Sequence, residues 1–410
     1  MSVLSPELVA EPLIVARKPS QARPGLVKRL ARIVLVLARL FLAVAFCTQF
    51  VTAILVVGWT TRWMRRQIWQ GWWRAAGSNS DLSVNQLASL IHLDVNGDRP
   101  PRWIVADHFL ERWNALAPDG TPPTRLRKLI RLPRLLVGGL FTNLQEGIRT
   151  LAATLCITGP GCFLMLAGWR YGWDNSFLKG YEQAYIGRIT GFIGVLLLIP
   201  ALIYLPMGWA HLAASGRFRA FFDRRLIMAV TRSRLAWITL WVAMLAVFAA
   251  PLHIAWVRVY NTAEEFPWLS EASPEQLQSF IQGYVFNTCF LVAPLYLISR
   301  LLAARIYRVG LPLVLVQRPD LAGNLEHPLW AGLSALGLFQ AKPHSRRHPV
   351  VAKALATGRW GTRTILWILL PVLCFVFIAE MFVAQFLHAH DFLIWINPVL
   401  LHLPCPRWKL

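Results

Sequence analysis

The sequence is poor in acidic residues and in charge generally, which limits the kinds of protein that it can encode. Its 410 residues include 20 Asp and Glu against 42 Lys and Arg, and charged residues make up only 15% of the chain. About a quarter of the residues of an average soluble domain are charged. The low proportion excludes an ordinary soluble globular protein and predicts that several segments face lipid.

The sequence also lacks the motifs that mark common reactions. It has six Cys and no Cys-x-x-Cys pair, which excludes a zinc ribbon or a disulfide framework. It contains no P-loop, no His-Glu-x-x-His helix, no dinucleotide fingerprint and no Ser-His-Asp order. We therefore predict no catalytic residue and no metal site, and we expect a protein that is not an enzyme.

Long apolar runs are abundant, and each is close to the length of about 20 residues that crosses a bilayer. They cover 33–59, 150–169, 190–212, 235–256, 281–302 and 364–387. We predict an all-α, polytopic transmembrane helical bundle with five to six spans and basic amphipathic interfacial helices. The count is open because the run 33–59 has basic residues at both ends, so that it either spans or re-enters.

The distribution of charge between the runs predicts the orientation of the chain. The connector 211–234 holds six Arg against one Asp, and 303–363 is also basic, whereas 259–280 carries four Glu and no Lys or Arg. Short basic loops stay in the cytoplasm. We therefore predict that 211–234 and 303–363 are cytoplasmic and that 259–280 lies outside.

These patterns divide the chain into seven segments. They are a basic N-terminal tail (1–32), the first apolar segment (33–59), cytoplasmic or interfacial helices (60–148), a four-helix transmembrane core (149–306), a basic connector (307–363), the last span (364–388) and a surface-lying tail (389–410). Ser83 with Gln86, and Ser273 with Gln276, have the capping-box pattern and predict two helix starts. Tryptophans at predicted span ends, such as Trp59, are expected to anchor the protein at the headgroup level.

Basic residues beside the apolar runs point to anionic lipid as a partner. The segment 60–78 interleaves Trp with Arg, and 124–148 repeats Leu and Ile at helical spacing among basic residues. Nucleic acid is the alternative partner for a net charge of +22. The position of the charges beside apolar runs favours lipid, so we expect no nucleic-acid partner. The predicted lipid contacts are Arg127, Lys128, Arg131, Arg217, Arg219, Arg224 and Arg225.

A few polar residues lie within or beside the predicted spans. A charge inside a span is costly and usually functional, so Glu380 is a candidate to relay a proton, bind a cation or pair with a partner's Arg. Asn287 and Gln385 are candidates for hydrogen bonds between helices. Histidines near the outer ends of two runs could hold a tetrapyrrole axially, but interfacial His are more often structural, and we predict no cofactor. These histidines are His253, His388 and His390.

Three short stretches resemble a known family. They read Gly-Tyr-Glu-Gln-Ala-Tyr at 180–185, Ala-Ser-Gly-Arg-Phe-Arg-Ala-Phe-Phe-Asp-Arg-Arg at 214–225 and Ala-Ala-Arg-Ile-Tyr-Arg at 303–308. Over about 140–310 the chain is similar to an uncharacterised family of bacterial polytopic membrane proteins, a domain-of-unknown-function family. The resemblance implies a helical bundle in the bacterial inner membrane and no established activity.

Two functions are compatible with these features. We expect a non-enzymatic scaffold or accessory subunit of a membrane assembly, in contact with the bilayer, anionic lipids and other membrane protein subunits. The alternative is a transporter or channel for a small solute or ion, which would use Glu380 and the proline-kinked spans.

Overall fold

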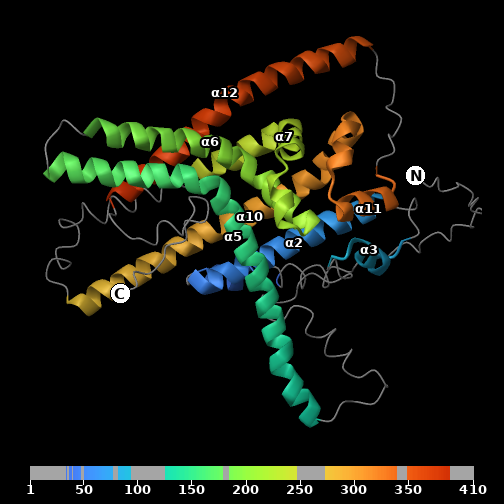
Figure 1. Cartoon of the computed structure of the whole chain (residues 1–410), viewed down its shortest axis with the longest axis horizontal. Helices are drawn as coiled ribbons and strands as arrows, with labels where there is room; N and C mark the ends of the chain where they lie inside the picture. Colours follow the sequence, from blue (N-terminus) through green and yellow to red (C-terminus); the bar gives the residue numbers. More distant parts are fainter. Residues whose placement is uncertain are drawn as a thin grey trace, which may run out of the picture.

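The computed structural model of the protein describes most of residues 34–47, and then 50–76, 82–93, 125–178, 184–246, 273–338 and 349–387, in places only as backbone. All regular structure in these ranges is helical (Figure 1). The predicted all-α class is confirmed for this part of the chain. The labelled elements are α2 (Phe50–Ala76), α3 (Val84–Ile91), α5 (Arg125–Leu178), α6 (Ala184–Ser215), η3 (Phe218–Phe222), α7 (Arg224–Ser233), α10 (Pro274–Gln317), η4 (Pro319–Asn324), α11 (His327–Ala335) and α12 (Pro349–Leu387).

Both predicted capping boxes mark real helix starts. At α3 the backbone N–H of Gln86 donates to the Ser83 hydroxyl at 3.2 Å, and the backbone N–H of Ser83 donates to the Gln86 side chain at 2.8 Å. Ser273 and Gln276 make the same pair of bonds at the start of α10, where Pro274 occupies the first turn. The capping-box pattern in the sequence therefore predicts the first residue of both helices.

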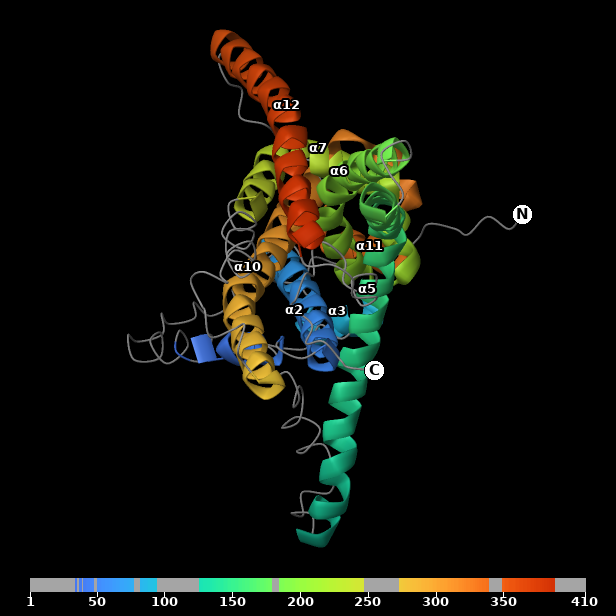
Figure 2. The same cartoon turned by 90° about the vertical axis from the view of Figure 1, so that its left-hand side faces the viewer.

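The pair α5 and α6 is the largest helix contact in the bundle. Glycines on both helices allow a close approach, because a Cβ on Gly161 would lie 3.0 Å from the Gly194 carbonyl oxygen and one on Gly194 would lie 2.7 Å from that of Gly161. Small residues serve this purpose where helices cannot rely on the hydrophobic effect for packing. The C-terminal part of α5 runs beside α6, whereas its first turns extend away from the bundle (Figures 1 and 2).

Two helices in the described ranges are long and apolar enough to cross a membrane, namely Gly139–Met165 and Ile189–Ser215. A third candidate is the pair Arg224–Ser233 and Leu235–Ala246, which meet at an angle of 88°. In α12 the corresponding apolar segment is the shorter Trp360–Val376. The protein thus has the helices of a membrane-associated protein, and five to six spans are not confirmed.

Apolar side chains also cover much of the outside of the bundle. On α6, Phe192 and Leu196 are exposed, and on α12 Trp360 is 70% exposed and Ile368 67% exposed. Soluble monomers rarely carry contiguous apolar patches of more than a few hundred Å². This surface suits lipid or a second membrane protein, and only part of α12 packs against α6.

The tryptophans of α2 do not behave as predicted. Trp59, expected to lie at the headgroup level, is buried in the bundle, as are Trp69 and Trp72. The indole N–H of Trp69 donates to the Ala214 carbonyl at 2.9 Å, and that of Trp72 donates to the Arg308 carbonyl at 2.7 Å. Buried indoles need such partners. The described part of the aromatic and basic pattern of 60–78 therefore belongs to a core helix, because carbonyls of α6 and α10 accept from its indole N–H groups.

Candidate functional site: a packed polar core and an arginine-lined cleft

The centre of the bundle contains an arginine that has no carboxylate beside it among the side chains that the structure describes. The side chain of Arg300, on α10, is fully buried. Its guanidinium donates to the Tyr296 hydroxyl at 2.5 Å, to the Thr61 hydroxyl at 2.7 Å and to the Met64 sulfur at 3.3 Å. All three acceptors are neutral, so hydrogen bonds rather than an opposite charge hold this cation.

Aromatic rings complete the surroundings of Arg300. Its guanidinium carbon lies 5.2 Å from the centre of the Trp209 ring and 5.4 Å from that of Tyr296. Cations at this distance are attracted to the faces of aromatic rings, most strongly when water is excluded. Arg300 therefore joins α10 to α2 and α6 in one packed polar contact.

The same network extends to α5 through hydroxyl and amide groups. Thr61 and Thr150 share a hydrogen bond of 3.0 Å, and the Trp209 indole N–H donates to the Thr154 hydroxyl at 2.9 Å. Arg62 donates to the Asn143 side-chain oxygen at 3.0 Å. These groups pair with one another across four helices, so the polar interior that the structure describes holds the bundle together.

A second layer of polar contacts, which contains an ion pair, lies nearer the C-terminal end of α6. Arg65 forms a 3.1 Å salt bridge to Glu146 and donates to the Ala213 carbonyl at 2.8 Å. Both side chains are largely buried, so the pair is shielded from solvent. From this layer onward the elements η3, α7, η4, α11 and α3 form one end of the molecule, which we call the basic pole.

The two basic connectors meet at the basic pole. Arg217, just before η3, forms a 2.6 Å salt bridge to Glu326, just before α11. In the first connector the Tyr204 hydroxyl donates to the Phe221 carbonyl, which ties η3 to α6. Asp223 then caps α7 by accepting from the backbone N–H of Leu226 at 3.3 Å. The connectors are thus folded into one structure.

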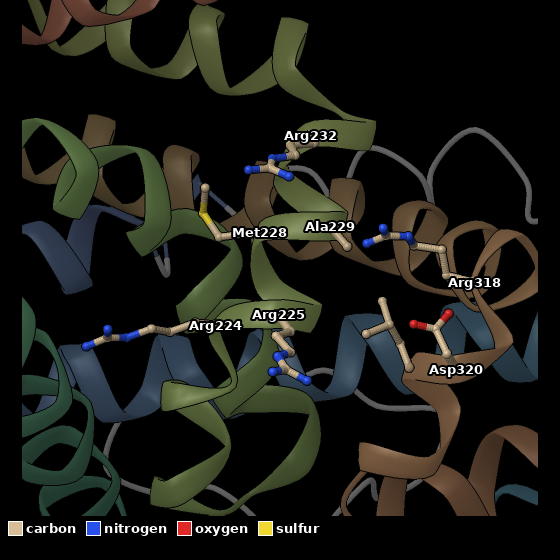
Figure 3. A pocket seen from close by; sticks show the side chains of 8 residues that line it. Arg224, Arg225, Met228, Ala229, Arg232, Arg318 and Asp320 are labelled. Carbon is tan, nitrogen blue, oxygen red and sulfur yellow. The ribbon is translucent and has the colours of Figure 1, made fainter.

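An arginine-lined cleft opens between α7 and η4, with a volume of about 550 Å³ (Figure 3). Its wall from α7 comes from residues 224, 225, 228, 229 and 232, a spacing that places them on one side of the helix. The other side of α7, which includes Leu226 and Val230, is buried. The burial of this apolar side directs the arginines of α7 outward into the cleft.

The cleft has an excess of positive charge. Four arginines line it, Arg224, Arg225, Arg232 and Arg318, together with the single acid Asp320, which gives a formal charge of 4 − 1 = +3. The ion pairs described elsewhere in the molecule use other arginines, among them Arg65 and Arg217. Such a concave cluster with net positive charge attracts anions.

Burial has a visible effect on the neighbouring carboxyl group. Burial raises the pKa of Asp223 above its ordinary value, and the nearby Glu326 raises it further. The hydrogen bond from the Leu226 backbone and the charge of Arg225 lower the pKa, by less than burial raises it but by more than Glu326 does. The acid that caps α7 therefore contributes less negative charge beside the cleft than its formal count suggests.

The structure locates four of the predicted lipid-contact residues in detail. Arg224 and Arg225 line the cleft, Arg219 is exposed on η3, and Arg217 pairs with Glu326. Arg127, Lys128 and Arg131 lie in the first turns of α5, but their side chains are outside the described part of the structure. The contacts with lipid themselves stay predictions.

The other predicted residues lie mostly outside what the structure describes. Glu380 and Gln385 are on α12 and Asn287 is on α10, with only the backbone described. The histidines His253, His388 and His390 are outside the described residues. In the ranges where side chains are described, His, Cys, Asp and Glu do not gather in a group of three or more that could hold a metal ion.

Sequence reasoning missed two parts of this arrangement. Arg300 lies inside the predicted span 281–302, where an arginine in an apolar run is the signal that was overlooked. Arg318 lies 86 residues after Arg232 in the chain, so only the fold brings it to the cleft. Nothing in the local pattern around Arg318 indicates this partner.

Comparison with known proteins finds a family to which part of the chain is similar. The profile of a family described as "protein of unknown function (DUF4013)" matches residues 135–259. This confirms the resemblance to an uncharacterised family, although the match stops before residues 303–308, which we had included. The matched range contains α6, η3 and α7, and therefore the side of the cleft that α7 forms. No curated protein and no solved structure matches the chain.

Proposed function

We propose that the protein is an integral membrane scaffold, or an accessory subunit of a membrane assembly, and that it is not an enzyme. The observation that carries the proposal is the combination of two features. Polar groups of the interior are hydrogen-bonded to one another, and apolar side chains are exposed on the outside of the bundle. Arg300 donates to Thr61 and lies over the ring of Trp209, whose indole N–H donates to Thr154. The outer faces of α6 and α12 are left apolar and exposed. Such faces are suited to lipid and to other membrane helices.

The proposed orientation puts the basic pole in the cytoplasm of a bacterial cell, at the inner membrane. Its support is that the connectors 211–234 and 303–363, both predicted to be cytoplasmic, touch through Arg217 and Glu326 and line one cleft. Two segments in contact outside the bilayer must lie on the same side of it. In this arrangement the five to six spans rise from the basic pole, and 259–280 lies outside.

The proposed partner surface is the exposed face of α12. Trp360, Ile365 and Ile368 are exposed there, within a helix that is apolar between Trp360 and Val376. Substituting polar residues for Ile365 and Ile368 should release a partner subunit without unfolding the bundle, because neither side chain is buried. The same substitutions at Phe192 and Ile193, exposed on α6, are the matched control.

The test is native mass spectrometry of the tagged protein after extraction in a mild detergent. A complex of fixed stoichiometry that the α12 substitutions dissolve and the α6 substitutions preserve supports the proposal. A monomer of unchanged mass across all three proteins contradicts it.

A transporter or channel is the second candidate, and prolines within the helices favour it. Pro200 and Pro206 lie inside α6, Pro294 inside α10 and Pro371 inside α12. Prolines free backbone carbonyls, which transporters use to bind ions and substrates. In proteoliposomes, Glu380→Gln should abolish proton or cation flux under this candidate, and Glu275→Gln, at the exposed start of α10, should not.

A further inference from the structure

We propose that the arginine-lined cleft is a binding site for the headgroup of an anionic lipid that carries two phosphates. The inference deepens the proposed function and rests on its placement of the basic pole at a membrane surface. It assigns a ligand to Arg224, Arg225, Arg232 and Arg318, which line one cleft (Figure 3).

The charge of the cleft fits two phosphates better than one. A formal charge of +3 exceeds what one phosphodiester neutralises. Guanidinium groups bind phosphate oxygens through two parallel hydrogen bonds, and one phosphate is satisfied by one or two such groups. Four arginines therefore offer more donors than one phosphate can use.

The spacing of the arginines supports the same conclusion. Arg224 and Arg232 are eight residues apart on α7, which corresponds to about 12 Å along the axis of a helix. One phosphate group cannot contact both ends of that row. Two phosphates joined by a short linker can, with Arg318 on the opposite wall available to either.

Apolar surface beside the cleft favours a lipid over a soluble diphosphate. The last turns of α10, which lead to Arg318, carry an exposed stripe of Val309, Leu313 and Val316 at helical spacing. Phe218, on η3, and Trp237, just after α7, are also exposed. Basic pockets flanked by apolar helix surface are the sites at which diphosphate lipids bind membrane proteins.

The experiment compares lipid binding by full-length variants of the protein with native mass spectrometry. The cleft variant is Arg225→Gln with Arg232→Gln, and the control variant is Arg305→Gln with Arg363→Gln, which removes two exposed arginines from outside the cleft. The probes are diphosphatidylglycerol, phosphatidylglycerol and inorganic pyrophosphate. We expect the wild type to bind diphosphatidylglycerol at least about tenfold more tightly than phosphatidylglycerol, because each lost charge-assisted contact costs about a factor of ten or more.

Each outcome decides the proposal. A loss of about tenfold or more in the cleft variant, with the control variant unchanged, supports it. Equal losses in both variants would mean diffuse attraction to the basic pole and would overturn it. Binding of pyrophosphate as tight as that of the lipid would assign the cleft to a soluble diphosphate instead. Because the purified protein is tested without a partner, failure here leaves the scaffold proposal standing.

Discussion

Arg300 is the residue on which the interior of the bundle depends most directly. A buried cation usually has an acid beside it, and here it has a phenol, a hydroxyl, a thioether and an indole ring. Neutral acceptors bind a guanidinium less strongly than a carboxylate does. The arrangement is stable only while all of them stay in place, because each lost partner leaves a buried donor unsatisfied.

Replacing Arg300 with lysine should therefore destabilise the protein although the charge is kept. An ammonium cannot bond to Thr61 and Tyr296 in the same planar geometry, nor stack on Trp209. We expect a loss of about 1–3 kcal/mol in the free energy of unfolding. Thermal or denaturant unfolding in detergent measures it. Arg305→Lys, at an exposed position on the same helix, should change stability by less than about 0.5 kcal/mol.

Asp223 offers a residue-scale prediction about pH. Because burial raises its pKa in the folded protein, folding takes up a proton between the ordinary and the raised pKa. The stability from this group is fully present below the ordinary pKa and is lost as pH rises through the raised one. Asp223→Asn keeps an acceptor for the Leu226 N–H, so its stability relative to wild type should improve as pH rises through that range.

Asp223→Ala separates the capping role from the charge. It removes the carboxyl and also the acceptor at the start of α7, so it should be less stable than Asp223→Asn by about 1 kcal/mol at all pH values. Unfolding curves of the wild type and both variants, recorded from acid to neutral pH, test this pair of predictions. Parallel pH dependence of wild type and Asp223→Asn would show that the carboxyl does not titrate differently on folding.

At the scale of elements, the crossing of α2 and α5 depends on two glycines. A Cβ on Gly58 would lie 1.8 Å from the Asn143 carbonyl oxygen, and one on Gly147 would lie 2.1 Å from that of Ile54. Both contacts are with backbone atoms, which cannot move aside as a side chain can. The helices must separate to admit even a methyl group.

Gly147→Ala should accordingly weaken the bundle. We expect a loss of about 1–3 kcal/mol in the free energy of unfolding, which is typical of an overpacked interior. Gly159→Ala is the matched control on the same helix, because no atom lies within 4 Å of its added Cβ. A gain of up to about 1 kcal/mol from the better helix propensity of Ala is expected there. Equal effects of both substitutions would argue against the close crossing.

The helices also show which parts of the fold the sequence can predict. Local signals succeed: the two capping boxes locate the starts of α3 and α10, and the run 190–212 falls within the candidate span Ile189–Ser215. Long-range packing decides the rest. The pattern of 60–78 is the same for an interfacial helix and for a buried one, because Trp and Arg can be satisfied by lipid headgroups or by carbonyls of other helices.

The same distinction applies to the candidate site. The stripe of arginines on α7 can be read from the sequence, and Arg224 and Arg225 are predicted as lipid contacts because they are basic residues beside an apolar run. The contribution of Arg318 to the cleft cannot be predicted from the sequence, because it depends on how α10 packs against α7. Arg300 was visible in the sequence, but its neutral surroundings come from α2 and α6 and could not be inferred from α10.

At the scale of the whole molecule, the basic pole brings together segments from three parts of the chain. The C-terminal part of α2 contacts α10 through Trp72 and Arg308, α3 packs on α11, and η3 is bridged to α11 by Arg217 and Glu326. These contacts form one surface at one end of the bundle. Any bilayer crossed by α5 and α6 leaves that surface on one side.

This gives a prediction about accessibility. With the native cysteines replaced, Arg219→Cys on η3 and Trp330→Cys on α11, both exposed, should react with a membrane-impermeant maleimide from the same side. Inside-out membrane vesicles should label both and intact cells neither. Labelling of the two positions from opposite sides would contradict the proposed orientation. Reaction after solubilisation in detergent controls for buried thiols.

The salt bridge between Arg217 and Glu326 has a consequence for topology that does not depend on counting hydropathy peaks. In the proposed orientation its two ends share a compartment, and a chain that leaves a compartment and returns to it passes the boundary an even number of times. The number of crossings between residues 217 and 326 is then even, whatever the 88° bend after α7 does. The proposed orientation therefore excludes one or three spans between these residues and permits two.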